Sequence, residues 1–198
     1  MMPTQVPRKD KNGKMDRNIN LRDVFNNMSI FETEPDIVDE IVRGQIGESA
    51  AAWDPAFNED LVNHLFEEEL DLVALNVNRG RDHGLPGYNT YRGICRSGSY
   101  DRVNSFPELA RENVLSQGDI SALKAVYDDI DDIDLFVAGV MEKRHQDALL
   151  GPVFTCILGD QFIRLKEGDR FYYENGDVAT RFTLPQLDAI RKVSMARM

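Results

Sequence analysis

Polar side chains able to do chemistry gather at the end of an apolar run in the middle of the chain. Arg79 and Arg81 carry planar guanidinium groups, which suit the two oxygens of a carboxylate. Asn76 lies inside the apolar run, so we expect its amide to be buried and to need hydrogen-bond partners. On these residues alone the favoured interpretation is structural: Asn76 bonds to a loop carbonyl, and the arginines pair with Asp82 or with the acidic run at 67–69.

Three further groups of side chains resemble catalytic or metal sites, but each is better explained by a structural role. His83 is predicted to be a hydrogen-bonded structural histidine, because no nucleophile lies near it in sequence. The aspartate-rich stretch 128–134 suggests calcium, yet it lacks the glycine and the final glutamate of an EF-hand loop, so a solvated helix terminus is favoured. Glu142 and His145 have the spacing of two ligands on one helix face, but the charged residues around them indicate a surface. We therefore assign no metal site.

Helix signals follow one another from Leu21 onward, so the predicted fold class is mainly α. In the first half we expect a capping box at Thr33–Asp36 with a helix ending at Gly44, and a cap at Asn58. In the second half we expect a capping box at Ser105–Glu108 with a helix toward Gly118, a helix from Asp119, an apolar helix from Val153 to Gly168, and a capping box at Thr183–Gln186.

Strand signals are scarce. The aromatic run 171–177 is the one good strand candidate, which allows at most a short β-hairpin near residues 171–182. Residues 1–20 are polar and charge-mixed and are interpreted as a mobile lead-in or a turn, and residues 21–198 as a single unit.

Composition excludes several classes of protein. Twenty-three Lys and Arg against 34 Asp and Glu give a net charge of −11, which disfavours binding to nucleic acid or to an anionic membrane surface. No run of about 18 apolar residues is present, so no membrane-spanning helix is expected. The first ten residues lack the apolar region of a signal peptide. Two cysteines and three histidines are too few for a zinc framework.

The stretch Leu75–Asn89, followed by Tyr91 and Arg92, closely resembles a signature of the animal haem peroxidases. Further blocks similar to that family follow in the same order: residues 133–139 with Glu142, then 151–165, 168–175 and 186–191. The resemblance runs from roughly Leu21 to Met195, which is nearly the whole chain.

The resemblance implies roles for single residues. Asn76 matches the asparagine that orients the proximal histidine ligand of haem iron, and Arg79 matches a position near a haem propionate. Arg81, Asp82 and His83 would hold the motif together.

The resemblance also bears on the cysteines and on where the protein works. Cys95 and Cys156 match a family disulfide, with two buried free thiols as the alternative. A disulfide would imply an oxidising compartment, and the resemblance implies an extracellular protein. In a secreted chain, Asn27-Met28-Ser29 would be a glycosylation sequon.

The peroxide chemistry of the family, and with it a role in the response to oxidative stress, requires a distal histidine, a distal arginine and the proximal histidine. All three lie N-terminal to the position of Asn76, and none of His64, His83 and His145 occupies a matching position. We therefore expect the C-terminal part of a haem peroxidase, whose partners are haem and the N-terminal part of the domain. Alone it is expected to be inactive and to expose apolar faces. The alternative is a non-catalytic fragment or degenerate copy that serves as an interaction or structural module.

Overall fold

The computed structural model describes residues 5–15, 18–49, 52–66, 69–95 and 101–194. Its N-terminal elements are β1 (Gln5–Val6), β2 (Ile19–Asn20), η1 (Leu21–Asp23), α1 (Ser29–Thr33), α2 (Ile37–Ile46) and α3 (Glu59–Val62). The central elements are α4 (Leu72–Asp82), α5 (Tyr88–Cys95), α6 (Phe106–Arg111), α7 (Gln117–Val126), η2 (Ile130–Asp132) and α8 (Leu135–Met141). The chain ends with α9 (Pro152–Gly168) and α10 (Leu184–Arg191). The predicted mainly α fold class is confirmed.

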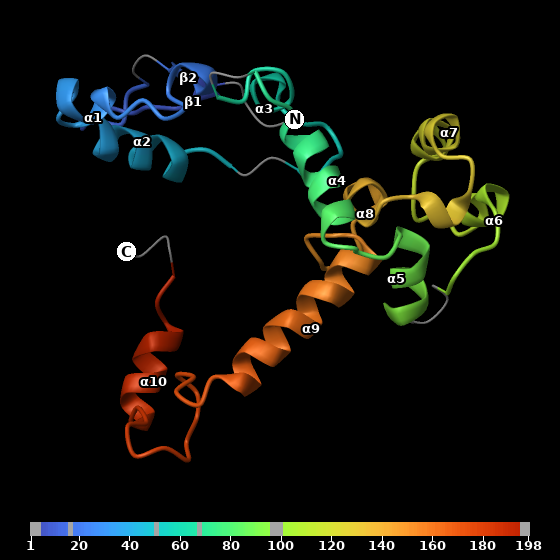
Figure 1. Cartoon of the computed structure of the whole chain (residues 1–198). Helices are drawn as coiled ribbons and strands as arrows, with labels where there is room; N and C mark the ends of the chain where they lie inside the picture. Colours follow the sequence, from blue (N-terminus) through green and yellow to red (C-terminus); the bar gives the residue numbers. More distant parts are fainter. Residues whose placement is uncertain (1–4, 16–17, 50–51, 67–68, 96–100, 195–198) are drawn as a thin grey trace.

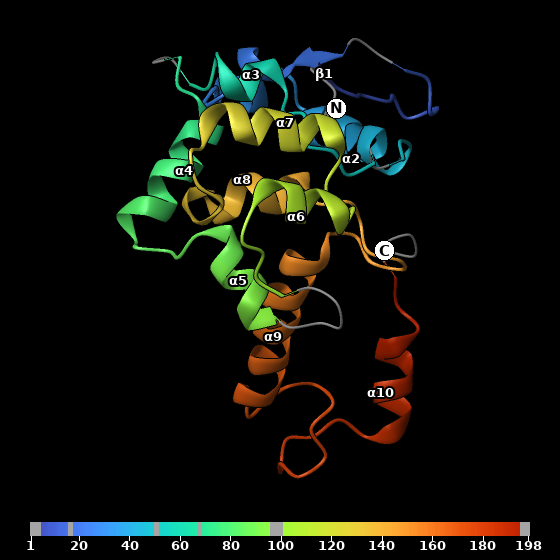
Figure 2. The same ribbon diagram turned by 90° about the vertical axis from the view of Figure 1, so that its right-hand side faces the viewer.

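The elements form an open arch (Figure 1). Helices α4 to α8 make the central body, and the strands lie with α1, α2 and α3 at one end of it. Helix α9 begins in the body and projects away from it, and α10 lies beyond the far end of α9. The view turned by 90° shows the same projection of α9 and α10 below the body (Figure 2).

The hydrophobic core lies in the central body. It is built from apolar side chains of α5 to α8, of the loops between them, and of the first turn of α9: Tyr88, Val103, Phe106, Leu109, Val114, Leu115, Ile120, Leu123, Ile130, Ile133, Ala138 and Val153. Burial of this apolar surface is the main driving force that holds these elements together.

Several helix beginnings follow the predicted caps. The Asn58 side chain accepts a hydrogen bond from the Asp60 amide at 2.8 Å, and Thr183 forms its capping box with Gln186. Ser105 also caps a helix, α6, but that helix ends at Arg111 rather than near Gly118. The next helix starts at Gln117, because Ser116 and Asp119 form a second capping box just before and within its first turn.

The helix near residue 40 differs from the prediction. The expected box at Thr33 does not form: α1 ends at Thr33, and α2 begins after Asp36 without a side-chain cap. Gly44 does not end α2, which continues to Ile46. Gly44 is instead buried against the N-terminal segment, where a Cβ atom would overlap the Pro7 carbonyl oxygen. The glycine is therefore required for close packing rather than for helix termination.

The polar N-terminal segment is folded where it is described. Strands β1 and β2 pair antiparallel. Arg8 is buried and donates to Glu34 at 2.6 Å and, through Nε, to Glu40 at 3.0 Å. These contacts fasten the N-terminal segment to α1 and α2, and the chain turns at residues 11–13, so of the two predicted forms residues 5–15 take the turn. The division of the chain at residue 20 stays a prediction.

The strand predicted at 171–177 does not form, and the described sheet is β1–β2. Side chains occupy the backbone groups that a hairpin would use. The side-chain amide of Asn175 donates to the backbone carbonyls of Asp169 and Arg170, at 3.0 and 3.2 Å. The backbone N–H of Phe171 donates to the Asp169 carboxylate at 2.8 Å. Local hydrogen bonds of this kind favour turns over strands.

The N-terminal elements contact the central body where α3 packs on α4, and a tryptophan adds a hydrogen bond to α8. The indole N–H of Trp53 donates to the carbonyl oxygen of Val140, in α8, over 3.1 Å. Trp53 is the one tryptophan in the sequence.

Candidate functional site

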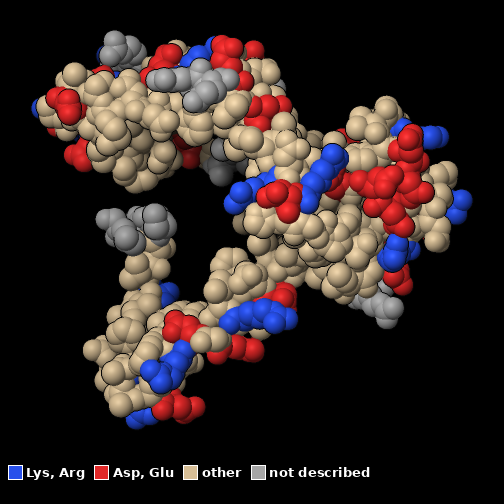
Figure 3. Space-filling view, in the orientation of Figure 1, with Lys and Arg blue, Asp and Glu red and all other residues tan. Residues whose placement is uncertain are grey.

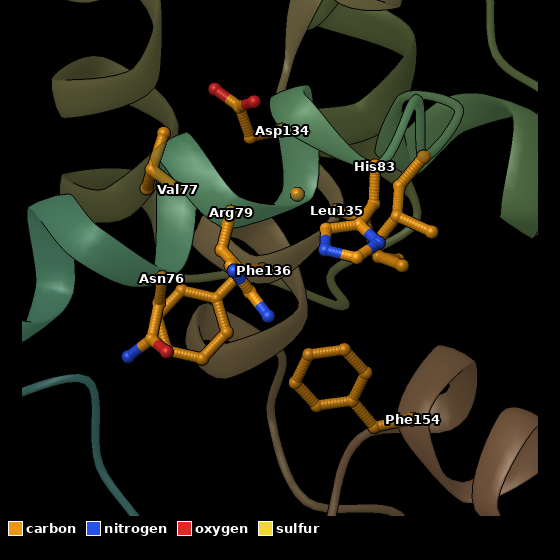
Figure 4. Close-up of a pocket in the computed structure, with 10 residues that line it drawn as sticks. Asn76, Val77, Arg79, His83, Asp134, Leu135, Phe136 and Phe154 are labelled. Carbon is orange, nitrogen blue, oxygen red and sulfur yellow. The ribbon is translucent and has the colours of Figure 1, made fainter.

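A cavity of about 410 Å³ lies between α4, α8 and the start of α9 (Figure 4). Helix α4 and the turn after it form one wall, with Asn76, Val77, Arg79, Gly80, His83 and Leu85. The start of α8 and the first turn of α9 form the opposite wall, with Asp134, Leu135, Phe136 and Phe154. Most of the lining is apolar, with a few polar groups at fixed positions, as is usual for a ligand site.

Helix α4 places three polar residues of the sequence motif on the cavity. Asn76, Arg79 and His83 are spaced by three and four residues, so they share one helix face. The helix begins where the Asp71 side chain accepts a hydrogen bond from the Ala74 amide at 3.0 Å. In Figure 4 the side chain of Arg79 extends toward the same space as the rings of Phe136 and Phe154.

Asn76 is half-buried on the cavity wall, whereas the sequence predicted a buried amide. Within the described ranges, neither its amide nor the guanidinium of Arg79 takes part in a hydrogen bond or an ion pair. The amide does not bond to a loop carbonyl, because α4 turns it toward the cavity. Both side chains therefore keep their hydrogen-bonding capacity for a ligand.

Arg81 faces away from these two residues and joins α4 to α8. Its guanidinium donates to both oxygens of Asp134, at 3.0 and 2.7 Å. The Tyr127 hydroxyl donates to the same carboxylate at 2.7 Å. The hydrogen bond from Arg81 lowers the pKa of Asp134. Arg81 thus pairs across 53 residues, and not with Asp82 or Glu69 as the sequence suggested; Glu67 and Glu68 lie outside the described residues.

Asp82 and His83 contribute little to the contact between α4 and α8. Both are exposed, and the closest approach of the His83 ring nitrogen to the Asp82 carboxylate is 4.0 Å. The carboxylate is therefore too far for a hydrogen bond. His83 instead borders the cavity mouth.

A buried polar network lies behind the cavity wall. Glu142 is 2% exposed and accepts hydrogen bonds from the Tyr88 hydroxyl at 2.7 Å and from the Val153 amide at 2.8 Å. Arg92 is 0% exposed, reaches the Tyr88 hydroxyl at 3.3 Å and pairs with Glu112. Burial raises the pKa values of Glu142 and of Tyr88.

Sequence reasoning did not find this network, although Tyr88, Arg92 and Glu142 lie in the quoted motifs. The spacing of Tyr88 and Arg92, four residues apart on one helix, was the available signal. The charged residues around Glu142 and His145 predicted a surface position for both. Because α8 ends at Met141, the two side chains do not share a helix face, and His145 is exposed.

Cys95 and Cys156 form a disulfide, with 5.9 Å between their Cα atoms. This excludes the alternative of two free thiols. The bond joins the end of α5 to the second turn of α9, next to the buried network.

Three of the aspartates at 128–134 have structural partners: Asp129, Asp131 and, as described above, Asp134. Asp129 caps η2. Asp131 accepts hydrogen bonds from Asn89 at 2.5 Å and from Arg102 at 2.8 Å, and the Asn89 bond lowers its pKa. Acidic side chains are plentiful on this side of the molecule, over the region of α6 and α7 (Figure 3).

The predicted sequon lies on the surface. Asn27 is exposed, and its side-chain oxygen accepts hydrogen bonds from the Ser29 hydroxyl at 2.6 Å and the Ser29 amide at 3.2 Å.

As for the membrane, none of the helices within the described ranges has the length and apolar character needed to cross a bilayer.

Comparison with known proteins adds to this geometry. The family described as animal haem peroxidase matches residues 1–198. A peroxidase of Drosophila melanogaster is 36% identical over 184 residues, which cover 91% of this chain and 26% of that protein. Peroxidase-like protein 3 of Lottia gigantea is 37% identical over 181 residues, which cover 90% of this chain and 57% of that protein. The chain thus spans about a quarter to a little over half of these relatives.

Solved structures show a similar arrangement of helices. Peroxidase A of Dictyostelium discoideum matches with a TM-score of 0.76 and 25% identity, over 95% of this chain and 37% of that one. A fatty acid alpha-dioxygenase of Oryza sativa matches with a TM-score of 0.67 at 19% identity, over 86% of this chain and 30% of that one, which shows a shared fold.

Proposed function

Because this chain belongs to the animal haem peroxidase family, we propose that it forms the C-terminal portion of a domain that oxidises substrates with hydrogen peroxide. One observation carries the proposal: Asn76 and Arg79 face an apolar cavity with their hydrogen-bonding groups uncommitted within the described part of the chain. The residues fit haem, whose ring is apolar and whose propionates are anionic. When bound, haem supplies the redox chemistry toward peroxide.

Asn76 is the proposed orienting group for the proximal histidine, which comes from another part of the domain. Its side-chain carbonyl accepts the ring N–H of that histidine. Such a hydrogen bond fixes the ring orientation and makes the ligand more basic. The position of Asn76 on the cavity wall, one helical turn before Arg79, supports this role.

Arg79 is the proposed partner of a haem propionate. A guanidinium without a carboxylate partner, at the mouth of an apolar cavity, suits a charge-assisted hydrogen bond to an anionic group. Phe136 and Phe154 face the same space and would contact the apolar ring and exclude water from it.

The distal histidine, the distal arginine and the proximal histidine are assigned to the upstream part of the domain. That part is also the proposed partner of the exposed apolar side chains on α9 and α10, which include Phe162, Ile163 and Leu184. We therefore expect this chain by itself to lack peroxidase activity.

A chimera tests the role of Asn76. In the Drosophila peroxidase, the segment that matches this chain is replaced by residues 1–198, and the haem spectrum and peroxide turnover are measured. Asn76→Ala should lower turnover by about 10- to 100-fold and shift the Soret band, as loss of such outer ligands does. Asn78→Ala is the matched control, because Asn78 is exposed on the same helix and does not line the cavity.

Three results would each contradict a part of the proposal. If Asn76→Ala and Asn78→Ala chimeras behave alike, Asn76 does not orient the ligand. If the purified 198-residue chain mixed with haemin oxidises guaiacol with peroxide, the assignment of the catalytic residues to the upstream part is wrong, and the chain is an enzyme by itself. If the chimera binds no haem although it folds, the alternative of an interaction or structural module is favoured.

We further propose an extracellular location, supported by the disulfide, since such bonds persist in oxidising compartments. In a secreted chain we expect N-glycosylation at Asn27, whose amide is exposed and already hydrogen-bonded to the Ser29 hydroxyl. After secretion from cells with a heterologous leader, a glycosidase should reduce the mass of the chain and of Asn26→Gln, but not that of Asn27→Gln. An unmodified Asn27 in the secreted chain would show that the sequon is not glycosylated.

A further inference from the structure

Helix α9 begins without a cap of its own. Its N-cap residue, Gly151, has no side chain that could accept a hydrogen bond, and Pro152 at the first helical position has no N–H to donate. The first N–H that needs an acceptor belongs to Val153, and it donates to the carboxylate of Glu142 at 2.8 Å. The longest helix of the described chain is therefore capped by a side chain that follows α8.

The Glu142 carboxylate is well suited to this role. A negative charge at a helix N-terminus interacts favourably with the helix dipole and with the unpaired N–H groups there. The second oxygen of Glu142 accepts the hydroxyl of Tyr88, in α5, at 2.7 Å. The packing around it is tight, because a Cβ atom at Gly151 would overlap the Glu142 side chain. One buried carboxylate thus joins the end of α8, the start of α9 and α5.

The residue after Val153 forms the cavity wall. Phe154 faces the cavity, and its ring lies on Gly139, where a Cβ atom would overlap the ring. Gly139 lies in α8 and Glu142 follows its last residue; Gly139 provides room for the ring, and Glu142 holds the adjacent backbone amide. The position of Phe154 is therefore set from α8 and not by α9 alone.

We infer that Glu142 is a positioning residue, which fixes Phe154 on the wall of the cavity by capping α9 from the end of α8. The inference deepens the proposed function, since it rests on that function for the identity of haem as the ligand. The placement of Phe154 itself is independent of haem and can be measured without it.

The test places a fluorescent reporter on the wall. In the full chain, W53F removes the native tryptophan and F154W puts the only indole beside the cavity. In this background Glu142→Gln keeps the size of the side chain but loses the charge and one acceptor oxygen. We expect the indole at position 154 to shift its emission to longer wavelength and to show about a twofold rise in acrylamide quenching, because the first turn of α9 opens more often.

The matched control is Asp119→Asn, which weakens a carboxylate cap of α7, remote from Phe154 in sequence and absent from the cavity lining. It should lower thermal stability yet leave the emission at position 154 unchanged. If Glu142→Gln does not fold, Glu142→Asp replaces it, because the shorter side chain keeps the charge but withdraws from the Val153 amide. A role of Glu142 in stability alone would lower the melting temperature of both cap variants without a selective effect on the reporter.

Two outcomes overturn the inference: an unchanged emission and quenching in the folded Glu142 variant, or an equal change in Asp119→Asn. Haem binding by the chimera described above is the separate readout. A folded chimera that binds no haem, together with the selective effect of the Glu142 variant, would count against haem as the ligand while leaving the positioning of Phe154 intact.

Discussion

The central body and the C-terminal arm of this protein contain the same kinds of apolar residue in very different surroundings. In the body, Leu109 is 0% exposed, and even the polar side chains of Arg92 and Glu142 are enclosed and hydrogen-bonded. In the arm, formed by residues 158–193, Phe162 is 68% exposed. Leu158, Ile163, Leu165, Leu184 and Ile190 are also on the surface.

The difference lies in what faces each helix. The apolar side chains of α6 and α7 pack on each other and share one buried core with Tyr88 of α5, whereas the second half of α9 and α10 face few described neighbours (Figures 1 and 2). Exposed apolar surface of this kind marks an interaction site. Since the chain spans only part of the relatives that it resembles, the upstream part of the domain is the proposed cover. The body can thus form its core from this chain, and the arm cannot.

The largest effect should come from removing the disulfide between the end of α5 and the second turn of α9, just before the arm begins. Replacing Cys95 and Cys156 together by serine should lower the free energy of unfolding by about 4 kcal/mol, because the disulfide closes a long loop in the unfolded chain. Urea denaturation followed by circular dichroism measures this. A loss below about 1 kcal/mol would mean that the unfolded chain is already restricted in that loop.

A smaller effect distinguishes the two regions directly. Leu109→Ala should cost about 3 kcal/mol, because it leaves a cavity in the core. Phe162→Ala removes a larger side chain but should change the free energy of unfolding by less than about 0.5 kcal/mol, because Phe162 is already in water. Paired urea titrations compare the two. Equal losses of unfolding free energy would show that the arm is packed in solution as the central body is.

The smallest effect concerns the ionic contact between α9 and α10. Glu174 accepts hydrogen bonds from Lys166 and Arg191, both at 2.7 Å, and these lower its pKa to about 2. A lowered pKa contributes stability above the unfolded value of 4.5, and this contribution is lost as the pH falls toward 2. NMR titration of the carboxyl should find this value, and Lys166→Met should raise it. Because Glu174 is partly exposed and both of its partners are exposed, salt should weaken the contact. A Glu174 pKa near 4.5 would show that α10 is not held against α9.

The sequence predicted local features well and contacts across the chain poorly. The caps at Asn58 and Thr183 depend on residues two or three positions apart, so their pattern is visible in the sequence. The family motif led to Asn76 and Arg79, which do share a cavity. By contrast, the partner of Arg81 lies 53 residues away and could not be read from its neighbours.

The predictions for Glu142 and Gly44 were wrong for the same physical reason. A glycine after an apolar helical stretch is typical of a helix end, but Gly44 is required by the backbone of Pro7, which the local pattern does not contain. A glutamate among charged residues is typical of a surface, but Glu142 follows the last residue of α8 and turns inward to α9. In both cases the decisive atoms belong to a distant segment.

The hydrogen bond between Trp53 and Val140 has a consequence for following the order of unfolding. It joins residues 87 positions apart, and no other indole contributes to the emission of the chain. Emission from the unaltered protein therefore follows detachment of the segment before α3 from α8, while circular dichroism follows the loss of helix everywhere. If the two transitions occur at different urea concentrations, the N-terminal elements and the body are separate cooperative units.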